Sequence, residues 1–320
     1  MHIAFCHHLS LKYGGGGEKW LAEIANELAL RGHKVEVNCL PFTMGDTKSK
    51  VAAPVLLNDV EYNEGLFHNV KGADVTYVTY NPLNWLSFKT SRPRIAGIHS
   101  HCYWQHLDAK YGMLPNLANF FNSIIGGKEL ARFDAIHTVT DIYPISHGRV
   151  FFVPDFVDSN VYKPTSEKRE EFTVGFASRK VWQKGYDIFK QLQQMLKDVA
   201  FVATENIAEA LMPKFYSMNH LTIVPARVDT FGLTLVESLM CKTPVLSSGL
   251  ETHKSLKLPI SFAEGIKEYA GRILYFKRTY KSAGYQKLVE AGRTSAMQKY
   301  DKEKVINRLE AMLEEVARCN

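Results

Sequence analysis

The sequence predicts an α/β protein with two domains, each a doubly wound parallel sheet covered by helices on both faces. Three observations lead to this prediction. The chain has 320 residues, more than a single hydrophobic core usually organises. Short apolar runs alternate with stretches of helical period in both halves of the chain. A stretch with two prolines, 150–164, separates the two series and has the composition of a linker.

The first half opens with an apolar strand at 2–8, which ends in the glycine loop 14–17. A helix is expected at 18–32, because its apolar residues recur with helical spacing and Arg31-Gly32 is a typical C-terminal stop. Further short strands are expected at 34–40, 73–80, 94–100 and 135–140. Strand and helix in this order predict parallel connections.

The second half repeats this order after the charged stretch 165–171. It contains expected strands at 172–178, 200–205, 221–226 and 243–248, and expected helices at 186–198 and 232–241. A last amphipathic helix is expected at 303–319. Two such sheets predict ligand binding at the carboxyl ends of their strands, so the loops after the strands are the candidate site.

Composition excludes several classes of protein. Apolar residues make up 46% and charged residues 22% of the chain, which indicates a folded protein. The net charge of +6 has no dense basic cluster, so no nucleic-acid partner is expected. No run of about 18 apolar residues and no signal peptide occurs, and the five cysteines are scattered. We therefore expect a cytoplasmic protein with free thiols.

Arg179 and Lys184 follow the first strand of the second half, with Gly185 behind them. An arginine can fork onto phosphate oxygens and a lysine supplies a point charge, so the pair suits a diphosphate. The alternative is that both are solvated basic residues before a helix.

The stretch 228–248 holds Asp229, then Phe231 and Gly232, then Glu237. Free backbone N–H groups where the loop enters a helix bind anions, and glycine lets a phosphate come close. Glu237 can accept hydrogen bonds from a ribose. The alternative is an acid that stabilises the helix dipole and a surface glutamate.

Taken together, these stretches resemble retaining nucleotide-sugar glycosyltransferases of the GT-B fold, in the large family four. The stretch 228–248 resembles that family's E-x7-E segment, and 174–185 resembles its Gly-Arg to Lys-Gly diphosphate segment. The stretch 152–164 resembles its linker, and 7–37 resembles its glycine loop and first helix. These four motifs occur in the family's order over most of the chain.

The resemblance implies a GT-B fold, in which two Rossmann-like parallel-sheet domains face each other across a cleft. The N-terminal domain, 1–150, would be the acceptor side, and the final helix, about 303–320, would pack back on it. The C-terminal domain, 151–302, would bind the donor. The implied reaction is hexosyl transfer from a nucleoside-diphosphate sugar to a hydroxyl of a glycan, a lipid or a small molecule, with the anomeric configuration retained. A UDP- or GDP-sugar is the expected donor, and neither a metal nor another cofactor is expected.

The resemblance also assigns roles to residues. The pair Arg179 and Lys184 would hold the donor diphosphate, and the backbone of Phe231, Gly232 and Leu233 would cap its distal phosphate. Glu237 would bind the ribose, and Asp229, in the place of the family's first glutamate, would face the sugar. Gly15 and Gly16 would approach the same phosphates or the sugar. His99 occupies the place of the family's active-site histidine.

Some alternatives stay open from the sequence. Asp229 is one methylene shorter than the family's glutamate, and Lys242 stands where the family prefers glycine. A nucleotide-sugar epimerase of GT-B fold or an inactive nucleotide-sugar-binding protein is therefore the runner-up. The apolar stretch 111–127 is either a core helix or an acceptor-side or membrane-facing element, which leaves peripheral membrane contact open. Ten of the twelve histidines precede residue 150, yet no complete set of metal ligands is evident.

Overall fold

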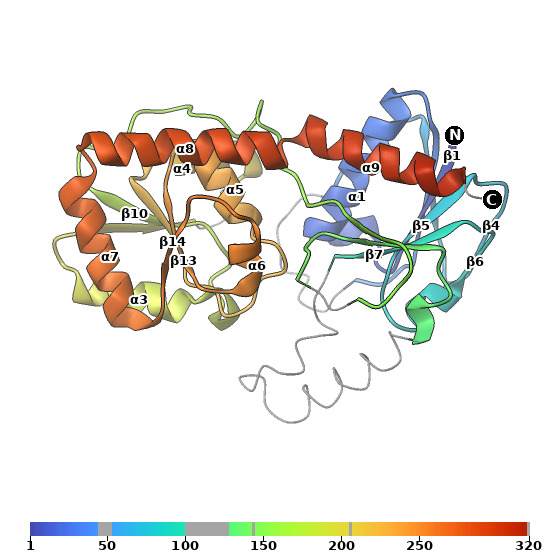
Figure 1. Cartoon of the computed structure of the whole chain (residues 1–320), viewed down its shortest axis with the longest axis horizontal. Coiled ribbons are helices and arrows are strands. Elements are labelled where there is room, and N and C mark those ends of the chain that lie inside the picture. Colours follow the sequence, from blue (N-terminus) through green and yellow to red (C-terminus); the bar gives the residue numbers. More distant parts are fainter. Residues whose placement is uncertain (44–52, 100–127, 143–144, 205–206, 319–320) are drawn as a thin grey trace. The chain divides into compact units, whose positions relative to one another are not determined.

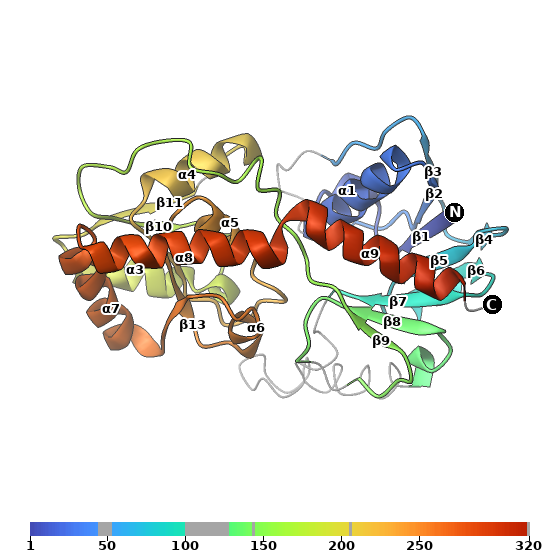
Figure 2. The same cartoon turned by 45° about the horizontal axis from the view of Figure 1, so that its top comes forward.

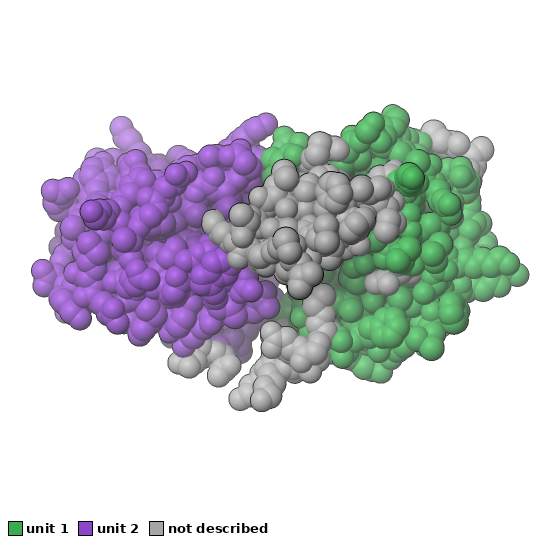
Figure 3. Space-filling model, turned by 90° about the horizontal axis from the view of Figure 1, so that it is seen from below, with its two compact units in different colours: residues 1–154, 306–320 green, residues 155–305 purple. Residues whose placement is uncertain are grey.

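A computed structural model describes residues 1–43, 53–99, 128–142, 145–204 and 207–318 (Figure 1). The chain forms two compact units. Unit 1 contains Met1–Pro154 and Ile306–Asn320, and unit 2 contains Asp155–Val305 (Figure 3). Among the described residues, no helix is both long and apolar enough to cross a membrane.

Unit 1 is built on a seven-stranded sheet in which every paired strand is parallel to its neighbour. Its inner strands are buried on both faces, which explains why they are nearly continuous apolar runs. In spatial order the strands are β3 (Val60–Glu64), β2 (Lys34–Cys39), β1 (His2–His7), β5 (Val75–Thr79), β7 (Arg94–Ile98), β8 (Ala135–Thr138) and β9 (Val150–Phe152). A separate pair joins β4 (His68–Val70) to β6 (Phe88–Thr90).

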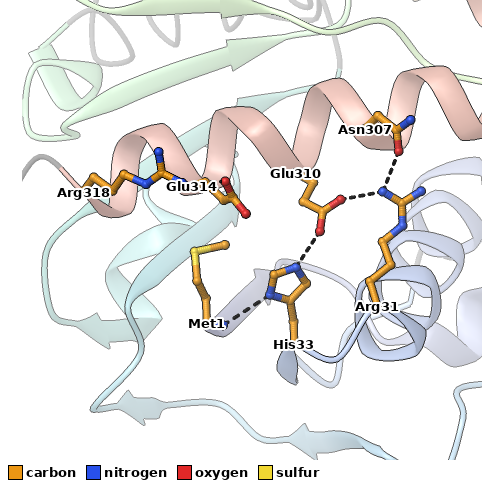
Figure 4. Close-up of polar contacts among 7 residues, drawn as sticks. All are labelled: Met1, Arg31, His33, Asn307, Glu310, Glu314 and Arg318. Atoms are coloured by element: carbon orange, nitrogen blue, oxygen red, sulfur yellow. Dashed lines mark hydrogen bonds and ion pairs between the residues drawn. The ribbon is translucent and has the colours of Figure 1, made fainter.

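Two long helices belong to unit 1 wholly or in large part, α1 (Gly16–Leu30) and α9 (Lys302–Ala317). Glu310 of α9 accepts hydrogen bonds from His33 at 2.7 Å and from Arg31 at 2.5 Å (Figure 4). The chain's amino group lies 3.3 Å from the other ring nitrogen of His33. The last helix is thus tied by charged contacts to the end of α1 and the start of β2.

Unit 2 contains a five-stranded parallel sheet with helices on both faces (Figure 1). In spatial order its strands are β11 (Ala200–Ala203), β10 (Thr173–Phe176), β12 (Leu221–Val224), β13 (Val245–Ser248) and β14 (Ser261–Ala263). Helices α3 and α7 pack on each other, as do α5 and α8, and Figure 2 shows α8 along its length. The helices are α3 (Tyr186–Met195), α4 (Met212–Met218), α5 (Leu233–Met240), α6 (Glu251–Ser255), α7 (Gly265–Thr279) and α8 (Ala283–Tyr300).

The predicted strands and helices are found close to their expected bounds, and the structure adds others. Strands β3, β4 and β6 are short and mostly exposed, so they lack the apolar runs that identified the rest. Strand β9 lies inside the stretch expected to be a linker. In unit 2, β14, α4, α6, α7 and α8 were not predicted.

Each sheet reverses its strand order at one point. In unit 1 the reversal lies between β1 and β5, and in unit 2 it lies between β10 and β12. Ligands of open α/β sheets bind outside the carboxyl ends of the strands at such a reversal. The chain that leaves β1 and β5 carries His7 and Thr79, and the chain that leaves β10 and β12 carries Lys184 and Asp229. The topology therefore marks one candidate site in each unit.

Candidate functional site

In unit 2, Lys184 ends a short 3-10 turn, Trp182–Lys184, that follows β10. The turn closes at Gly185, which has a φ of +74°. A Cβ on Gly185 would stand 2.0 Å from the carbonyl oxygen of Pro225, so both the conformation and the space require glycine. This fit directs the Lys184 side chain to Asp229, whose Oδ1 lies 3.0 Å from Nζ.

The same turn is held from outside by Arg227, which the sequence did not single out. Its guanidinium forks onto the two oxygens of Asp187, with both hydrogen bonds at 2.7 Å. It also donates to the carbonyl of Trp182 at 2.7 Å and lies 4.4 Å from the centre of the Trp182 ring. Arg227 therefore ties the start of α3 to the turn that carries Lys184.

Asp229 has contacts on both carboxylate oxygens. Oδ1 accepts a hydrogen bond from the backbone of Thr230 at 3.0 Å as well as the contact from Lys184. Oδ2 lies 3.4 Å from Nε2 of His253. Burial acts to raise the pKa of Asp229, but His253 and Lys184 outweigh it and hold that pKa well below its usual range. The carboxylate is therefore ionised, between two basic groups.

His253 is the second residue that the sequence analysis missed. It comes from α6, is fully buried, and shares a hydrogen bond of 2.7 Å with Ser247 through Nδ1. Its Nε2 forms no hydrogen bond with the described residues, although it faces both Asp229 and the start of α5. A buried nitrogen without a hydrogen bond is costly, and such groups often mark a ligand site.

Helix α5 begins at Leu233, after Gly232 in a left-handed conformation with a φ of +98°. No side chain caps this end. Phe231 is buried, and its ring lies edge-on to Tyr300 at 5.5 Å. Further along the helix, Glu237 accepts a hydrogen bond of 2.6 Å from the hydroxyl of Tyr216. The expected turn is thus present, with its backbone amides at the end of the helix that favours anions.

The structure brings together some of the predicted residues of unit 2 and not others. Lys184, Asp229 and Gly232 meet around His253. Arg179 is exposed and forms no ion pair with the residues that the structure describes. The roles predicted for these residues toward a donor stay predictions.

In unit 1, the glycine loop leads to a buried hydrogen-bonded pair, His7 and Glu18. Glu18, in the first turn of α1, accepts a hydrogen bond of 2.9 Å from Nε2 of His7. Burial acts to raise the pKa of Glu18, but the bond from His7 outweighs it and lowers that pKa. A Cβ on Gly15 would stand 2.5 Å from a Glu18 oxygen, whereas one on Gly16 would meet nothing within 4 Å. Gly15 is thus needed for the fold of the loop, and Gly16 leaves open space.

His99 lies just beyond β7 and takes part in a chain of hydrogen bonds. Its Nε2 is 2.8 Å from the hydroxyl of Tyr77, which is 2.5 Å from Nδ1 of His137. Nε2 of His137 donates to the carbonyl of Val153 at 2.7 Å. The ring of Trp20 lies 4.1 Å from that of His99 and covers the chain from α1. The predicted active-site histidine is thus one part of a buried polar network.

Among the described residues, no group of three or more His, Cys, Asp or Glu side chains is arranged to hold a metal ion. The absence of a metal from the reaction stays a prediction. His101, His106 and the apolar stretch 111–127 lie outside the described residues. The interpretations of that stretch as a core helix or a membrane-facing element are therefore untested.

No protein-family model and no curated protein matches the chain. Solved structures do match it over nearly its whole length. A sucrose-phosphate synthase from Thermosynechococcus elongatus has a TM-score of 0.76 at 12% identity, covering 100% of both chains. A glycosyltransferase from Rickettsia africae has a TM-score of 0.72 at 12% identity, also covering 100% of both. HepE from Anabaena, in complex with UDP and glucose, has a TM-score of 0.68 at 15% identity and covers 98% of this chain and 99% of its own.

These neighbours are GT-B glycosyltransferases, and at such low identity their likeness establishes the fold alone. The fold predicted from the motifs is thereby confirmed. The chain has the GT-B fold, with two Rossmann-like units built on parallel sheets.

Proposed function

We propose that the protein is a glycosyltransferase that moves a sugar from a nucleoside-diphosphate sugar to an acceptor hydroxyl, with the anomeric configuration retained and without a metal. The observation that carries this proposal is the start of α5. There a helix end without a side-chain cap and a lysine held by an aspartate lie beside the buried Nε2 of His253, which is 3.4 Å from that aspartate and has no hydrogen bond with the described residues. An anionic group at the helix start would receive hydrogen bonds from the backbone and charge from Lys184.

The chemistry of the proposed reaction matches these groups. When the diphosphate leaves, negative charge develops on its oxygens, and fixed donors around them lower the barrier. Lys184 and the amides of Phe231, Gly232 and Leu233 would supply these donors. Asp229 pairs with Lys184 at 3.0 Å, and we propose that it also faces the sugar. Glu237 would bind the ribose, and Arg179, exposed beyond β10, would close on the diphosphate.

Several parts of the proposal rest on the sequence resemblance. These are the retained configuration, a UDP- or GDP-sugar as donor, a glycan, lipid or small-molecule acceptor, and a cytoplasmic location with or without peripheral membrane contact. The fold neighbours support a UDP-sugar, because HepE binds UDP and glucose. Unit 2 would bind the donor and unit 1 the acceptor, with His99, Gly15 and Gly16 near the transferred sugar.

The first test measures binding of UDP, GDP and ADP, and of their sugars, by calorimetry. One nucleotide should bind, and Lys184→Ala should weaken its binding at least tenfold, about 1.4 kcal/mol. Lys190→Ala is the matched control, because Lys190 is exposed on α3 and its side chain donates a hydrogen bond of 3.1 Å to Gln193 of the same helix. Failure of the folded protein to bind any of these nucleotides would refute the proposal.

The second test follows turnover. Slow release of nucleotide from the bound donor, and an α-linked product from an α-linked donor, are the expected results. Conversion of one nucleotide sugar into another without acceptor would identify an epimerase. Binding without any turnover would identify an inactive binding protein. Glu237→Ala should weaken nucleotide binding, whereas Asp229→Ala should mainly lower turnover.

A further inference from the structure

Three side chains of unit 1, His99, Tyr77 and His137, form hydrogen bonds whose direction can be worked out from one end. The carbonyl of Val153 can only accept, so Nε2 of His137 must carry the proton in their 2.7 Å bond. Burial, and then the nearby His99, lowers the pKa of His137 to about 3. The ring is therefore neutral near pH 7, and its Nδ1 carries no proton.

The rest of the chain of bonds follows from this end. Because Nδ1 of His137 can only accept, the Tyr77 hydroxyl must give it its single proton, across 2.5 Å. The Tyr77 oxygen then has only lone pairs to offer to Nε2 of His99, 2.8 Å away. The short bond between these two atoms therefore requires a proton on Nε2 of His99.

We infer that Tyr77 and His137 are positioning residues that hold His99 in the tautomer protonated at Nε2, so that Nδ1 is the nitrogen with which His99 accepts a hydrogen bond from a ligand hydroxyl. The statement about the ligand rests on the proposed function, whereas the statement about the tautomer does not. A neutral imidazole has one acceptor nitrogen, so the tautomer decides which ring edge can receive a proton.

Gly97 makes this network sterically possible. It lies on β7, between Tyr77 on β5 and His137 on β8, and its partners in register are Thr79 and His137. A Cβ on Gly97 would stand 2.0 Å from the Tyr77 hydroxyl oxygen. The tyrosine can thus pass over β7 to the next strand only because residue 97 has no side chain.

The surroundings bury Tyr77 and His137 and leave His99 partly buried. The Trp20 ring lies 5.8 Å from that of Tyr77, 4.1 Å from that of His99 and 6.4 Å from that of His137. Tyr77 is fully buried and His137 is 1% exposed. In such surroundings a misdirected hydrogen bond leaves a buried polar group without its partner, which is unfavourable, so one tautomer dominates.

The test is a two-bond proton–nitrogen NMR spectrum of the full chain labelled with ¹⁵N-histidine, which distinguishes the two imidazole tautomers. In the wild type near pH 7.5, His99 and His137 should both be protonated at Nε2, with signals assigned by His99→Gln and His137→Gln. In Tyr77→Phe, His137 should keep its tautomer and His99 should become a mixture. A wild-type His99 protonated at Nδ1, or a His99 signal unchanged in Tyr77→Phe, would overturn the inference.

Two further variants make the test specific. Tyr80→Phe is the matched control, since Tyr80 is also buried and donates from its hydroxyl to Glu129 at 2.7 Å. It should leave the His99 signal unchanged, and an equal change there would overturn the inference. Gly97→Ala should reproduce the spectrum of Tyr77→Phe without altering any polar side chain, and a wild-type spectrum would count against the geometry.

Turnover separates this inference from the proposed function. With the donor identified, Tyr77→Phe should lower kcat about tenfold and change the nucleotide Kd less than twofold. Full turnover with a mixed His99 tautomer would refute the ligand role of Nδ1. If the tautomers behave as expected but the protein binds no nucleotide sugar, the positioning of His99 stands and the proposed function fails.

Discussion

His253 lies directly against Gly232. A Cβ on this glycine would stand 3.1 Å from Cδ2 and 3.2 Å from Nε2 of the imidazole. The same ring faces Asp229, which in turn contacts Lys184. His253, which comes from the five-residue helix α6, thus lies against the start of α5 and beside Asp229. Through Asp229 it is linked to the turn that carries Lys184.

Replacement of Gly232 by alanine should damage both the fold and the site. The left-handed φ of +98° is unfavourable for alanine, and the new methyl group would press on His253 and on Leu235. We expect a loss of about 1–3 kcal/mol in the free energy of unfolding, measured with urea. Nucleotide affinity should fall by at least tenfold in calorimetry.

The control for this variant is Gly271→Ala. Gly271 lies inside α7, and a Cβ there would meet nothing within 4 Å. Alanine should stabilise this helix by up to about 1 kcal/mol and leave nucleotide binding unchanged. Equal stability of the two alanine variants would contradict the role assigned to Gly232.

Asp229→Asn should change how stability depends on pH. The folded protein lowers the pKa of Asp229, so the ionised carboxylate stabilises the folded state. This stabilisation is complete above the pKa of the unfolded chain, about 3.9, and is lost as pH falls through the lower pKa of the folded protein. Near pH 7 the variant should be less stable by about 1–3 kcal/mol. The difference from the wild type should shrink below about pH 4. Urea unfolding at pH 7 and below pH 4 measures the difference in free energy of unfolding between the two proteins. A difference that does not change with pH would count against an ionised, paired Asp229.

His137→Gln should reduce the sensitivity of the protein to mild acid. The folded protein lowers the pKa of His137 from 6.5 to about 3, so between these values the unfolded chain binds a proton that the folded chain does not. The free energy of unfolding that comes from keeping His137 neutral is fully present above pH 6.5. It falls as pH decreases, by about 2 kcal/mol at pH 5. The variant should lose correspondingly less than the wild type between pH 7.5 and pH 5. Equal losses of unfolding free energy in the two proteins over this pH range would show that His137 is not the source of the acid sensitivity.

Arg227→Lys should weaken nucleotide binding without direct contact with the nucleotide. A lysine cannot reproduce the fork onto Asp187 or the stacking on Trp182, so the turn that ends in Lys184 becomes less ordered. We expect a Kd about three- to tenfold higher, with stability reduced by less than about 1 kcal/mol. Arg272→Lys is the control, because Arg272 is exposed and, among the described residues, forms its ion pair with Glu268 of the same helix. An unchanged Kd in Arg227→Lys would show that the turn needs no such clamp.

The sequence was most informative where local chemistry determines local structure. Gly185 and Gly232 could be located because each stands beside a motif at a point where the chain must turn. The buried parallel strands were predicted because both of their faces are apolar. His253, Arg227 and Tyr77 could not be found in this way, since each meets its partners only after tertiary packing.

The separation along the chain explains these omissions. Tyr77 and His137 are 60 positions apart, and Arg227 and Asp187 are 40 apart. His253 follows Asp229 by 24 positions and belongs to α6, whereas Asp229 lies in the loop before α5. A single sequence contains no signal that pairs such positions, whereas each expected site residue lies within a short motif of its own loop.

The glycine on β7 has a consequence for the natural variation of this protein. A mutation that adds a side chain at Gly97 would push Tyr77 away from its hydrogen-bond partners, unless residue 77 is already smaller than tyrosine, since the two occupy the same space. Positions 77 and 97 should therefore change together among related chains, in that order. Glycine at position 97 would then accompany tyrosine at position 77 in related chains, although glycine itself contributes no side chain to the network.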